Sequence, residues 1–294
     1  GGGYVSMSRK TEKKRRMSAG RVLDTGMTYL ILLAVAFVFF FPCLWLILAS
    51  FSKSGTIYSF DGFFPAGYSL ASFKRLFTDT ALYNYPRWFA NTLFVAAGSC
   101  ILGTFLVILT AYTMSRFTFA ARKPMMKITM VLGMFPSFMG MVAVYLLMTQ
   151  FNLINHLWGL ILIYSAGAPM GYLTQKGFFD TIPKAIDEAA RIDGCGYVQT
   201  WMKVIFPIAR PGIMTAAVLA FLNNWNEYYW ASLVLITREK LTVPALLSTF
   251  TTAFNTNYNG LFSAMVIIIL PPVLLYCIFS GFFIEALSGG AVKG

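Results

Sequence analysis

The chain has 294 residues, of which 57% are hydrophobic and 12% are charged, and its formal net charge is +12 at pH 7. Soluble domains carry about 25% charged residues, so this composition excludes an ordinary water-soluble globule and favours an integral membrane protein. A high positive charge can also indicate a nucleic-acid partner, but here the basic residues lie beside apolar segments, where they set membrane orientation, and we expect no nucleic-acid binding.

Six apolar segments are long enough to cross the hydrocarbon core, which requires roughly 20 predominantly apolar residues. Their apolar runs are continuous, which favours helices over a β-barrel. Gly167, Pro169 and Gly171 interrupt the fourth segment, but we expect no pair of matching broken spans of the kind found in secondary transporters. The sequence therefore predicts an all-α polytopic membrane protein with six transmembrane helices. They are residues 27–51, 88–114, 125–149, 157–175, 212–236 and 261–284.

The basic residues predict the orientation of these spans. Residues 1–26 are strongly basic, and short cytoplasmic segments of membrane proteins carry such an excess of Lys and Arg. With that end inside, six spans place the C-terminus inside as well, together with most of the 23 Lys and Arg residues. The outer side keeps Lys53, Lys74, Arg75, Arg87, Arg238 and Lys240. We therefore predict that both termini are cytoplasmic.

The spans divide the chain into regions. A cytoplasmic N-terminus, a first span, an outer segment, a core of five spans and a cytoplasmic tail follow one another, and the core contains a cytoplasmic insert and a second outer loop. The regions are 1–26, 27–51, 52–87, 88–285 and 286–294, with the insert at 181–212 and the loop at 237–260. The outer segment either contacts an external partner or caps the helix bundle, and its composition leaves both open.

The reactive side chains do not indicate an enzyme. Three of the four cysteines, Cys43, Cys100 and Cys277, fall within spans, and no C-x-x-C pair or His/Cys cluster occurs, so we expect no disulfide and no metal site. The sequence has no Ser/His/Asp set, no pair of intramembrane acids and no P-loop motif G-x-x-x-x-G-K-[ST]. We expect no catalytic residue and no cofactor bound by this chain itself.

The cytoplasmic insert is predicted to form two short helices. Thr181 is placed to cap the first, Pro183 suits its first turn, and Gly194 would end it as a left-handed residue. A second helix is expected from Tyr197 to Phe206. Pro207 would end that helix, so that the next span begins a few residues later.

The first of these helices has two different faces. An apolar stripe lies on one face, and oppositely charged i,i+4 pairs are expected on the wet face. The stripe is Ala185, Ile186, Ala189 and Ile192, and the pairs are Lys184–Glu188 and Asp187–Arg191. Such a helix can lie on the bilayer surface. A stripe that is half alanine binds lipid weakly, however, so docking into a groove of another protein is favoured while the membrane alternative stays open.

The insert resembles a motif of a known family. Glu188-Ala189-Ala190, then Gly194, then Val204, Phe206 and Pro207 resemble the EAA loop of ABC-importer permeases, whose pattern is E-A-A, three residues, G, nine residues, I, one residue, L-P. Val204 and Phe206 stand where Ile and Leu are usual. The stretches "IPKAIDEAARIDGCG" and "NNWNEYYWA" and the final "GGAVKG" resemble the carbohydrate branch. The resemblance covers nearly the whole chain and is best to the shorter, maltose-type permease subunit.

The resemblance implies a type I permease fold in a bacterial or archaeal inner membrane, and a role in an ATP-driven importer of a sugar or oligosaccharide. It implies that the insert docks into an ATPase subunit, which would use the ATP and Mg²⁺, and that its small residues permit close approach. The implied partners are a second permease subunit, two ATP-binding cassette subunits, an extracytoplasmic solute-binding protein, the carbohydrate and membrane lipids. The implied coupling residues are Glu188, Ala189, Ala190, Arg191, Asp193, Gly194 and Pro207.

Polar residues cluster inside the predicted fifth span. Asn223, Asn224, Asn226 and Glu227 lie near its middle, and Asn223, Asn226 and Glu227 are expected on one helical face with Tyr228 beside them. An ionisable residue at this depth is costly and indicates function, and amides, a carboxylate and aromatic rings suit a sugar. The same groups would equally serve to hold neighbouring helices or a partner subunit, and both interpretations stay open.

The resemblance also implies that a short loop reaches into the open solute-binding protein. The matching residues, at the end of the second outer loop, are Thr252, Asn255, Asn257, Tyr258 and Asn259. The alternative function is a secondary transporter or channel for a polar solute, but Glu227 would be its one deep acid. The outer loops are net basic, which would tolerate an anionic uronate oligomer, and a neutral maltodextrin-like substrate fits equally well.

Overall fold

The computed structural model describes residues 19–53, 60–61, 64–79, 84–166, 169–250 and 258–291. The chain divides into two compact units, residues 1–48 and 49–294, which are described separately. The α-helices are α1 (Ala19–Ser50), α2 (Ala71–Thr78), α3 (Tyr85–Arg116), α4 (Arg122–Gly133), α5 (Met141–Gln150), α6 (Leu157–Ala166), α7 (Pro169–Asp180), α8 (Lys184–Ile192), α9 (Tyr197–Thr200), α10 (Phe206–Trp225), α11 (Tyr229–Val234), α12 (Val243–Leu247) and α13 (Tyr258–Ala291). Shorter elements are η2 (Ser137–Gly140), η3 (Trp201–Ile205), η4 (Arg238–Lys240), η5 (Ser248–Phe250) and the antiparallel strands β1 (Phe60–Asp61) and β2 (Phe64–Pro65).

The first unit contains most of α1. Within this helix Thr25–Ser50 is long and apolar enough to cross a membrane. Large apolar side chains such as Leu33, Phe37 and Phe40 are exposed along it. A helix that is apolar on all sides is suited to lipid surroundings rather than to water.

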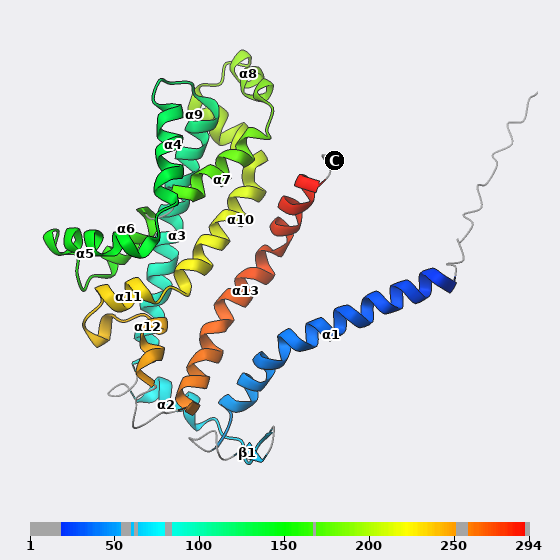
Figure 1. Cartoon of the computed structure of the whole chain (residues 1–294), viewed down its shortest axis with the longest axis vertical. Coiled ribbons are helices and arrows are strands. Elements are labelled where there is room, and N and C mark those ends of the chain that lie inside the picture. Colours follow the sequence, from blue (N-terminus) through cyan, green and yellow to red (C-terminus); the bar gives the residue numbers. More distant parts are fainter. Residues whose placement is uncertain are drawn as a thin grey trace, which may run out of the picture. The chain divides into compact units, whose positions relative to one another are not determined.

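Three long helices, α3, α10 and α13, form the frame of the second unit (Figure 1). Helix α3 packs against α6, α7 and α10, and α10 also packs against α13. One end of this frame carries α8 and α9, and the opposite end carries α2 and α12. The predicted cytoplasmic insert and the predicted outer segments therefore lie at opposite ends of the unit.

Four helices are continuous candidates for membrane spans, and two further pairs of helices are bent. The continuous ones are Thr25–Ser50, Tyr85–Arg116, Tyr197–Trp225 and Tyr258–Ile284. Arg122–Gly133 and Phe138–Gln150 meet at 94°, and Leu157–Ala166 and Gly171–Asp180 meet at 48°. Six spans result when each bent pair counts as one. Two of the six spans are therefore bent, although the sequence indicates an interruption in the fourth only.

The first of these bends has a local cause. Pro136 precedes η2 with extended backbone angles, φ −57° and ψ 130°, and a proline also disfavours helical geometry in the residue before it. The helix of α4 therefore stops near Gly133, and the chain resumes as α5 in a new direction. Figure 1 shows α5 and α6 running across the frame rather than along it.

The predicted start of the fifth span is wrong. Pro207 does not end a helix, because Tyr197–Trp225 is one continuous candidate span. The π-helical turn η3 precedes α10, with the Phe206 N–H donating to the Trp201 carbonyl, and Pro207 occupies the first turn of α10. The wider turn accommodates a residue that has no N–H to donate. The helix ends at Trp225, well before the predicted limit at residue 236.

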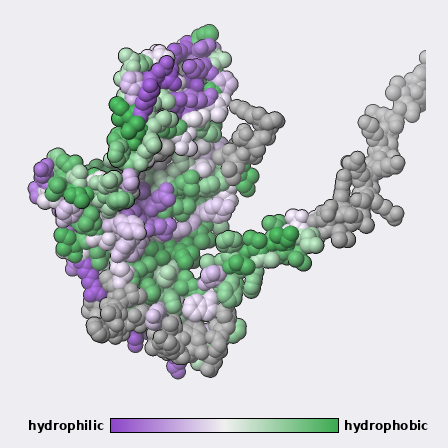
Figure 2. Space-filling model, in the orientation of Figure 1, coloured by the Kyte–Doolittle hydropathy of each residue, from purple (hydrophilic) through white to green (hydrophobic). Residues whose placement is uncertain are grey.

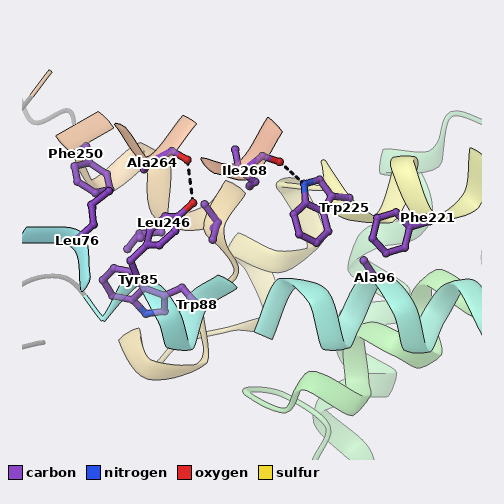
Figure 3. Close-up of a cluster of buried hydrophobic side chains, with 11 residues drawn as sticks. Leu76, Tyr85, Trp88, Ala96, Phe221, Trp225, Leu246, Phe250, Ala264 and Ile268 are labelled. Carbon is purple, nitrogen blue, oxygen red and sulfur yellow. Dashed lines mark hydrogen bonds between the residues drawn. The ribbon is translucent and has the colours of Figure 1, made fainter. Parts of the chain in front are cut away.

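A buried aromatic cluster fixes the end of the unit that carries α2 and α12 (Figure 3). The Tyr85 hydroxyl donates to the Ala264 carbonyl at 2.9 Å, and the Trp225 Nε1–H donates to the Ile268 carbonyl at 3.1 Å. Leu76 of α2 belongs to the same cluster. Part of the outer segment 52–87 is therefore packed onto the bundle, as the capping interpretation expects.

The second outer loop is also more ordered than predicted. Residues 237–250 contain η4, α12 and η5. The Asn91 Nδ2 donates to the Glu239 carbonyl at 2.8 Å, and the Val243 N–H donates to the Thr92 hydroxyl at 2.8 Å. Val243 is fully buried. Polar side chains of α3 thus hold this segment against the bundle.

Candidate functional site

The C-terminal end of α8 forms as the sequence predicts, but its N-terminal end does not. Gly194 has φ +83°, and its N–H donates to the Arg191 carbonyl while the Cys195 N–H donates to the Ala190 carbonyl. This is the glycine-ended C-terminus that the sequence predicts. The predicted cap at the other end is wrong, because Pro183 is the N-cap and the Thr181 hydroxyl donates to the Phe178 carbonyl instead.

The middle of α8 is fastened to the end of α3. Asp187 Oδ2 lies 3.1 Å from Arg116 Nε, and the two side chains are only 10% and 5% exposed. The N–H is not aligned on the oxygen, so this contact is an ion pair rather than a directed hydrogen bond. The Tyr112 hydroxyl donates to Asp187 Oδ1 at 3.4 Å, and Arg116 Nη2 donates to the Ile182 carbonyl at 3.1 Å. The predicted solvent-facing pair of Asp187 with Arg191 is therefore wrong.

The opposite side of α8 faces outward. Glu188 and Ala189 are exposed, whereas Ala190 is only 6% exposed. Ile192 is 86% exposed, although it is a large apolar residue. Only one residue of the Glu-Ala-Ala triplet thus packs inward, and the expectation that Ala190 permits an external approach is wrong. Figure 2 shows hydrophilic residues gathered at this end of the molecule.

Exposed apolar residues continue from α8 onto the start of the long helix. Val198 is 74% exposed and Met202 is 58% exposed. The Arg191 guanidinium lies 4.4 Å from the centroid of the Tyr197 ring, so a cation–π contact joins α8 to α9. We use the name α8 surface for the exposed residues of α8 and of the start of the long helix that follows it: Glu188, Ala189, Ile192, Val198 and Met202.

The buried side of this region is aromatic. The Tyr112 and Trp201 rings lie 4.6 Å apart between centroids, and the Phe179 ring packs on both. These rings come from α3, η3 and α7. Because η3 follows α9 directly along the chain, a displacement of α9 would act on α3 and α7 through these rings.

A second feature is a cavity of about 430 Å³ between α3, α6, α7 and α10. Gly212 lines it where α10 meets α7, and a Cβ on Gly212 would lie 2.8 Å from the Phe178 ring. Small residues let helices approach this closely. The polar residues that line the cavity are Ser99, Thr104, Tyr164, Thr174, Gln175, Thr215, Asn223 and Asn224.

The asparagines of the predicted fifth span divide into two groups. Asn223 and Asn224 line the cavity, and Asn224 Nδ2 donates to the Ser99 hydroxyl at 2.9 Å. Asn226 is exposed outside it and donates to the Leu222 carbonyl of its own helix. The expectation that Asn223, Asn226 and Glu227 share one helical face is wrong, because α10 ends at Trp225.

The carboxylate of Glu227 accepts hydrogen bonds from backbone N–H groups and from a tyrosine hydroxyl. Its Oε1 and Oε2 accept from the Trp230 N–H at 3.0 and 3.1 Å, and Oε2 also accepts from the Ala231 N–H at 3.2 Å. The Tyr164 hydroxyl donates to Oε2 at 2.5 Å. Glu227 therefore satisfies the first N–H groups of α11 and ties that helix to α6. Tyr228, the next residue, is 39% exposed and lies outside the cavity lining.

The residues predicted to reach a binding protein are mostly not described. Thr252, Asn255 and Asn257 lie outside the described residues. Tyr258 begins α13, and its ring packs on Phe262. Asn259 is buried and its Nδ2 donates to the Ser52 carbonyl at 2.7 Å, so it holds the bundle together.

Several of these contacts are not predicted by the sequence. The sequence does not single out Tyr112, Arg116 or Gln175 as site residues. A charged residue that follows a span gives no sign of a partner that lies far along the chain. The helical spacing of Tyr112 and Arg116, four residues apart, is a signal that places both on one face.

Comparison with known proteins gives the following similarities. The family described as "Binding-protein-dependent transport system inner membrane component" matches residues 101–288. The chain is 32% identical over 276 residues to the maltodextrin transport system permease protein MalD of Streptococcus pneumoniae, covering 93% of this chain and 97% of that protein. It is 29% identical over 284 residues to the galactooligosaccharides transport system permease protein GanQ of Bacillus subtilis, covering 95% and 99%.

A solved structure has a similar fold. It is described as a bacterial ABC transporter involved in the import of the acidic polysaccharide alginate, and it matches with a TM-score of 0.78. The match covers 90% of this chain and 98% of that chain at 20% sequence identity. The chain therefore shares the helical fold of that solved chain.

Proposed function

Because the chain belongs to the binding-protein-dependent transport system inner membrane components, we propose that it is the permease subunit of an ATP-driven importer of a sugar or oligosaccharide. Its helices make it a multi-pass membrane protein of this family. The two relatives are permeases of maltodextrin and galactooligosaccharide systems, which supports a carbohydrate as the cargo.

The α8 surface is the proposed contact with an ATPase. The observation that carries this proposal is the buried Asp187–Arg116 pair, which fixes α8 to α3 while Glu188 and Ala189 remain exposed. An acidic residue beside small and apolar ones suits a groove with a basic group. Asp193 would support the turn into Gly194, and Arg191 would hold Tyr197 in place.

The cavity is the proposed contribution of this chain to the translocation pathway. Asn223 and Asn224 line it, whereas Asn226, Glu227 and Tyr228 do not. A pathway between two subunits needs groups that bind the cargo weakly enough to release it, and uncharged amides meet this requirement. Glu227 would contribute only by positioning α11.

The remaining parts of the machine are supplied by other chains. We propose a second permease subunit, two ATP-binding cassette subunits that use ATP and Mg²⁺, and an extracytoplasmic solute-binding protein. The α8 end would face the cytoplasm with both termini, and the α2 and α12 end would face the binding protein. The basic segment before α1 supports this orientation.

Co-purification tests the proposal directly. A tag on this chain should recover an ATP-hydrolysing subunit from membranes, and Glu188→Lys should remove that subunit from the eluate. Glu239→Lys is the matched control, because Glu239 is exposed in η4 at the opposite end of the unit. A secondary transporter would behave differently: no ATPase would be recovered, and uptake would continue after ATP depletion.

A further inference from the structure

One buried amide nitrogen beside the cavity has no hydrogen-bond partner among the described residues. Gln175 is 4% exposed, and its Nε2 is the nitrogen concerned. Gln175 lies on α7 and lines the cavity. A buried donor without an acceptor is costly, so such groups are normally satisfied by a ligand, by water or by another chain.

The rest of the lining combines hydrogen-bonding groups with apolar walls. Asn223 and Thr104 add an amide and a hydroxyl, while Val107, Leu219 and Phe178 supply apolar surface. The volume of about 430 Å³ falls within the range of small-molecule sites. A sugar ring has the matching chemistry, with hydroxyl groups at its edge and C–H groups on its faces.

Charge is the second property of the cavity. None of the described residues that line it is an Asp, Glu, Lys or Arg. Lys176, the next residue on α7, pairs with Asp180 and is not part of the lining. Tyr164 lines the cavity, and its hydroxyl donates to the Glu227 carboxylate. The charged group that is hydrogen-bonded to the lining is therefore acidic. A carboxylate in this cavity would lose hydration without gaining a cationic partner among the described lining residues of this chain.

We propose that this cavity is a subsite for one uncharged sugar unit, held by Gln175 and Asn223, and that it excludes uronate units. The proposal rests on the proposed function of the chain and narrows its cargo. It decides between the neutral and anionic substrates that the sequence leaves open, in favour of the neutral one.

Occupancy of the cavity can be measured by the protection of an introduced cysteine from alkylation, and this assay does not require the solute-binding protein. Ala220→Cys, at a position that lines the cavity but is not proposed to hold the sugar, is introduced into the tagged complex with the four native cysteines of this chain replaced by serine. Alkylation of this chain by N-ethylmaleimide is timed with and without ATP. Maltotriose is expected to slow alkylation, and trigalacturonate is not. Asn226→Cys is the matched control, since Asn226 is exposed six positions further along the chain and does not line the cavity. Protection by trigalacturonate, or by neither sugar, would overturn the proposal.

Removal of the Gln175 amide gives a second readout. In the Ala220→Cys background, Gln175→Leu should raise the maltotriose concentration needed for half-protection about tenfold, as expected for one lost hydrogen bond. Gln150→Leu, which changes an exposed glutamine at the end of α5, should leave it unchanged. An equal value in both variants would contradict the role of Gln175. Recovery of the ATPase is scored separately, so a failed subsite and a failed importer are distinguished.

Discussion

Arg116 Nε lies 3.1 Å from Asp187 Oδ2, so the last residue of α3 is joined by charge to the middle of α8. Both side chains are buried, and Tyr112 adds a hydrogen bond to the same carboxylate. The contact joins the exposed α8 surface to the helix that packs against α6, α7 and α10. Because residues of α3 also line the cavity, a displacement of α8 would act on the cavity through α3.

Asp187→Ala is expected to lower the free energy of unfolding by about 3 kcal/mol, because it leaves the buried Arg116 guanidinium without a counter-charge. Arg116→Ala should have a similar cost, and the double variant should cost less than the sum. Unfolding of the purified chain in detergent, followed by tryptophan fluorescence, measures these values. Lys184→Ala is the control, since Lys184 is exposed on the same helix and its loss should cost at most about 0.5 kcal/mol. Strict additivity of the first two changes would contradict the pairing.

Neighbouring alanines of α8 should respond differently to enlargement. Ala190→Leu overfills a buried site and is expected to destabilise the chain by about 2 kcal/mol. Ala189→Leu, on the exposed side, should leave stability unchanged and reduce recovery of the ATPase. Thermal unfolding and co-purification are measured on both variants. The reverse pattern would show that the two faces of α8 are assigned wrongly.

Gly194→Ala should destabilise the end of α8 by about 1 kcal/mol, because Gly194 has φ +83° and alanine adopts this region only with strain. Gly196→Ala serves as the control, since Gly196 has φ −70° and open space around it. Hydrogen exchange of the α8 amides reports the difference. Equal exchange in both variants would indicate that the turn does not need glycine.

Glu227→Ala should loosen α11 by about 1 kcal/mol, because the N–H groups of Trp230 and Ala231 lose their acceptor. Faster hydrogen exchange at these two amides is the expected result. Asn226→Ala, which removes only a bond to the end of α10, is the control. If Glu227→Ala changes transport but leaves both amides protected, its role is in the pathway rather than in capping.

The class of fold follows from the sequence because long apolar runs leave helices as the available structure in lipid. The end of α8 is also predicted correctly, since Gly194 is a strong local signal for a helix end. Prolines are less informative. Pro136 breaks a helix, whereas Pro207 sits within a continuous one, because a π-turn absorbs the missing N–H.

The site is predicted less completely because its contacts join distant residues. The sequence pairs Asp187 with Arg191 in solvent, but the buried Arg116 is its partner. As an acidic residue in a predicted span, Glu227 is a candidate for the pathway, but in the structure its oxygens accept hydrogen bonds from the first turn of α11. The spacing of residues along a helix shows which of them share a face, but only the packing of the folded chain shows which face is buried.

The most direct test of the coupling role places a photoreactive phenylalanine analogue at Ala189, which is exposed on the α8 surface. Irradiation of native membranes is followed by purification through a tag on this chain and identification of the cross-linked species. The account predicts a cross-link to an ATP-binding cassette subunit, whose yield changes with ATP. Cross-links to lipid alone would show that α8 lies on the bilayer and would contradict the account.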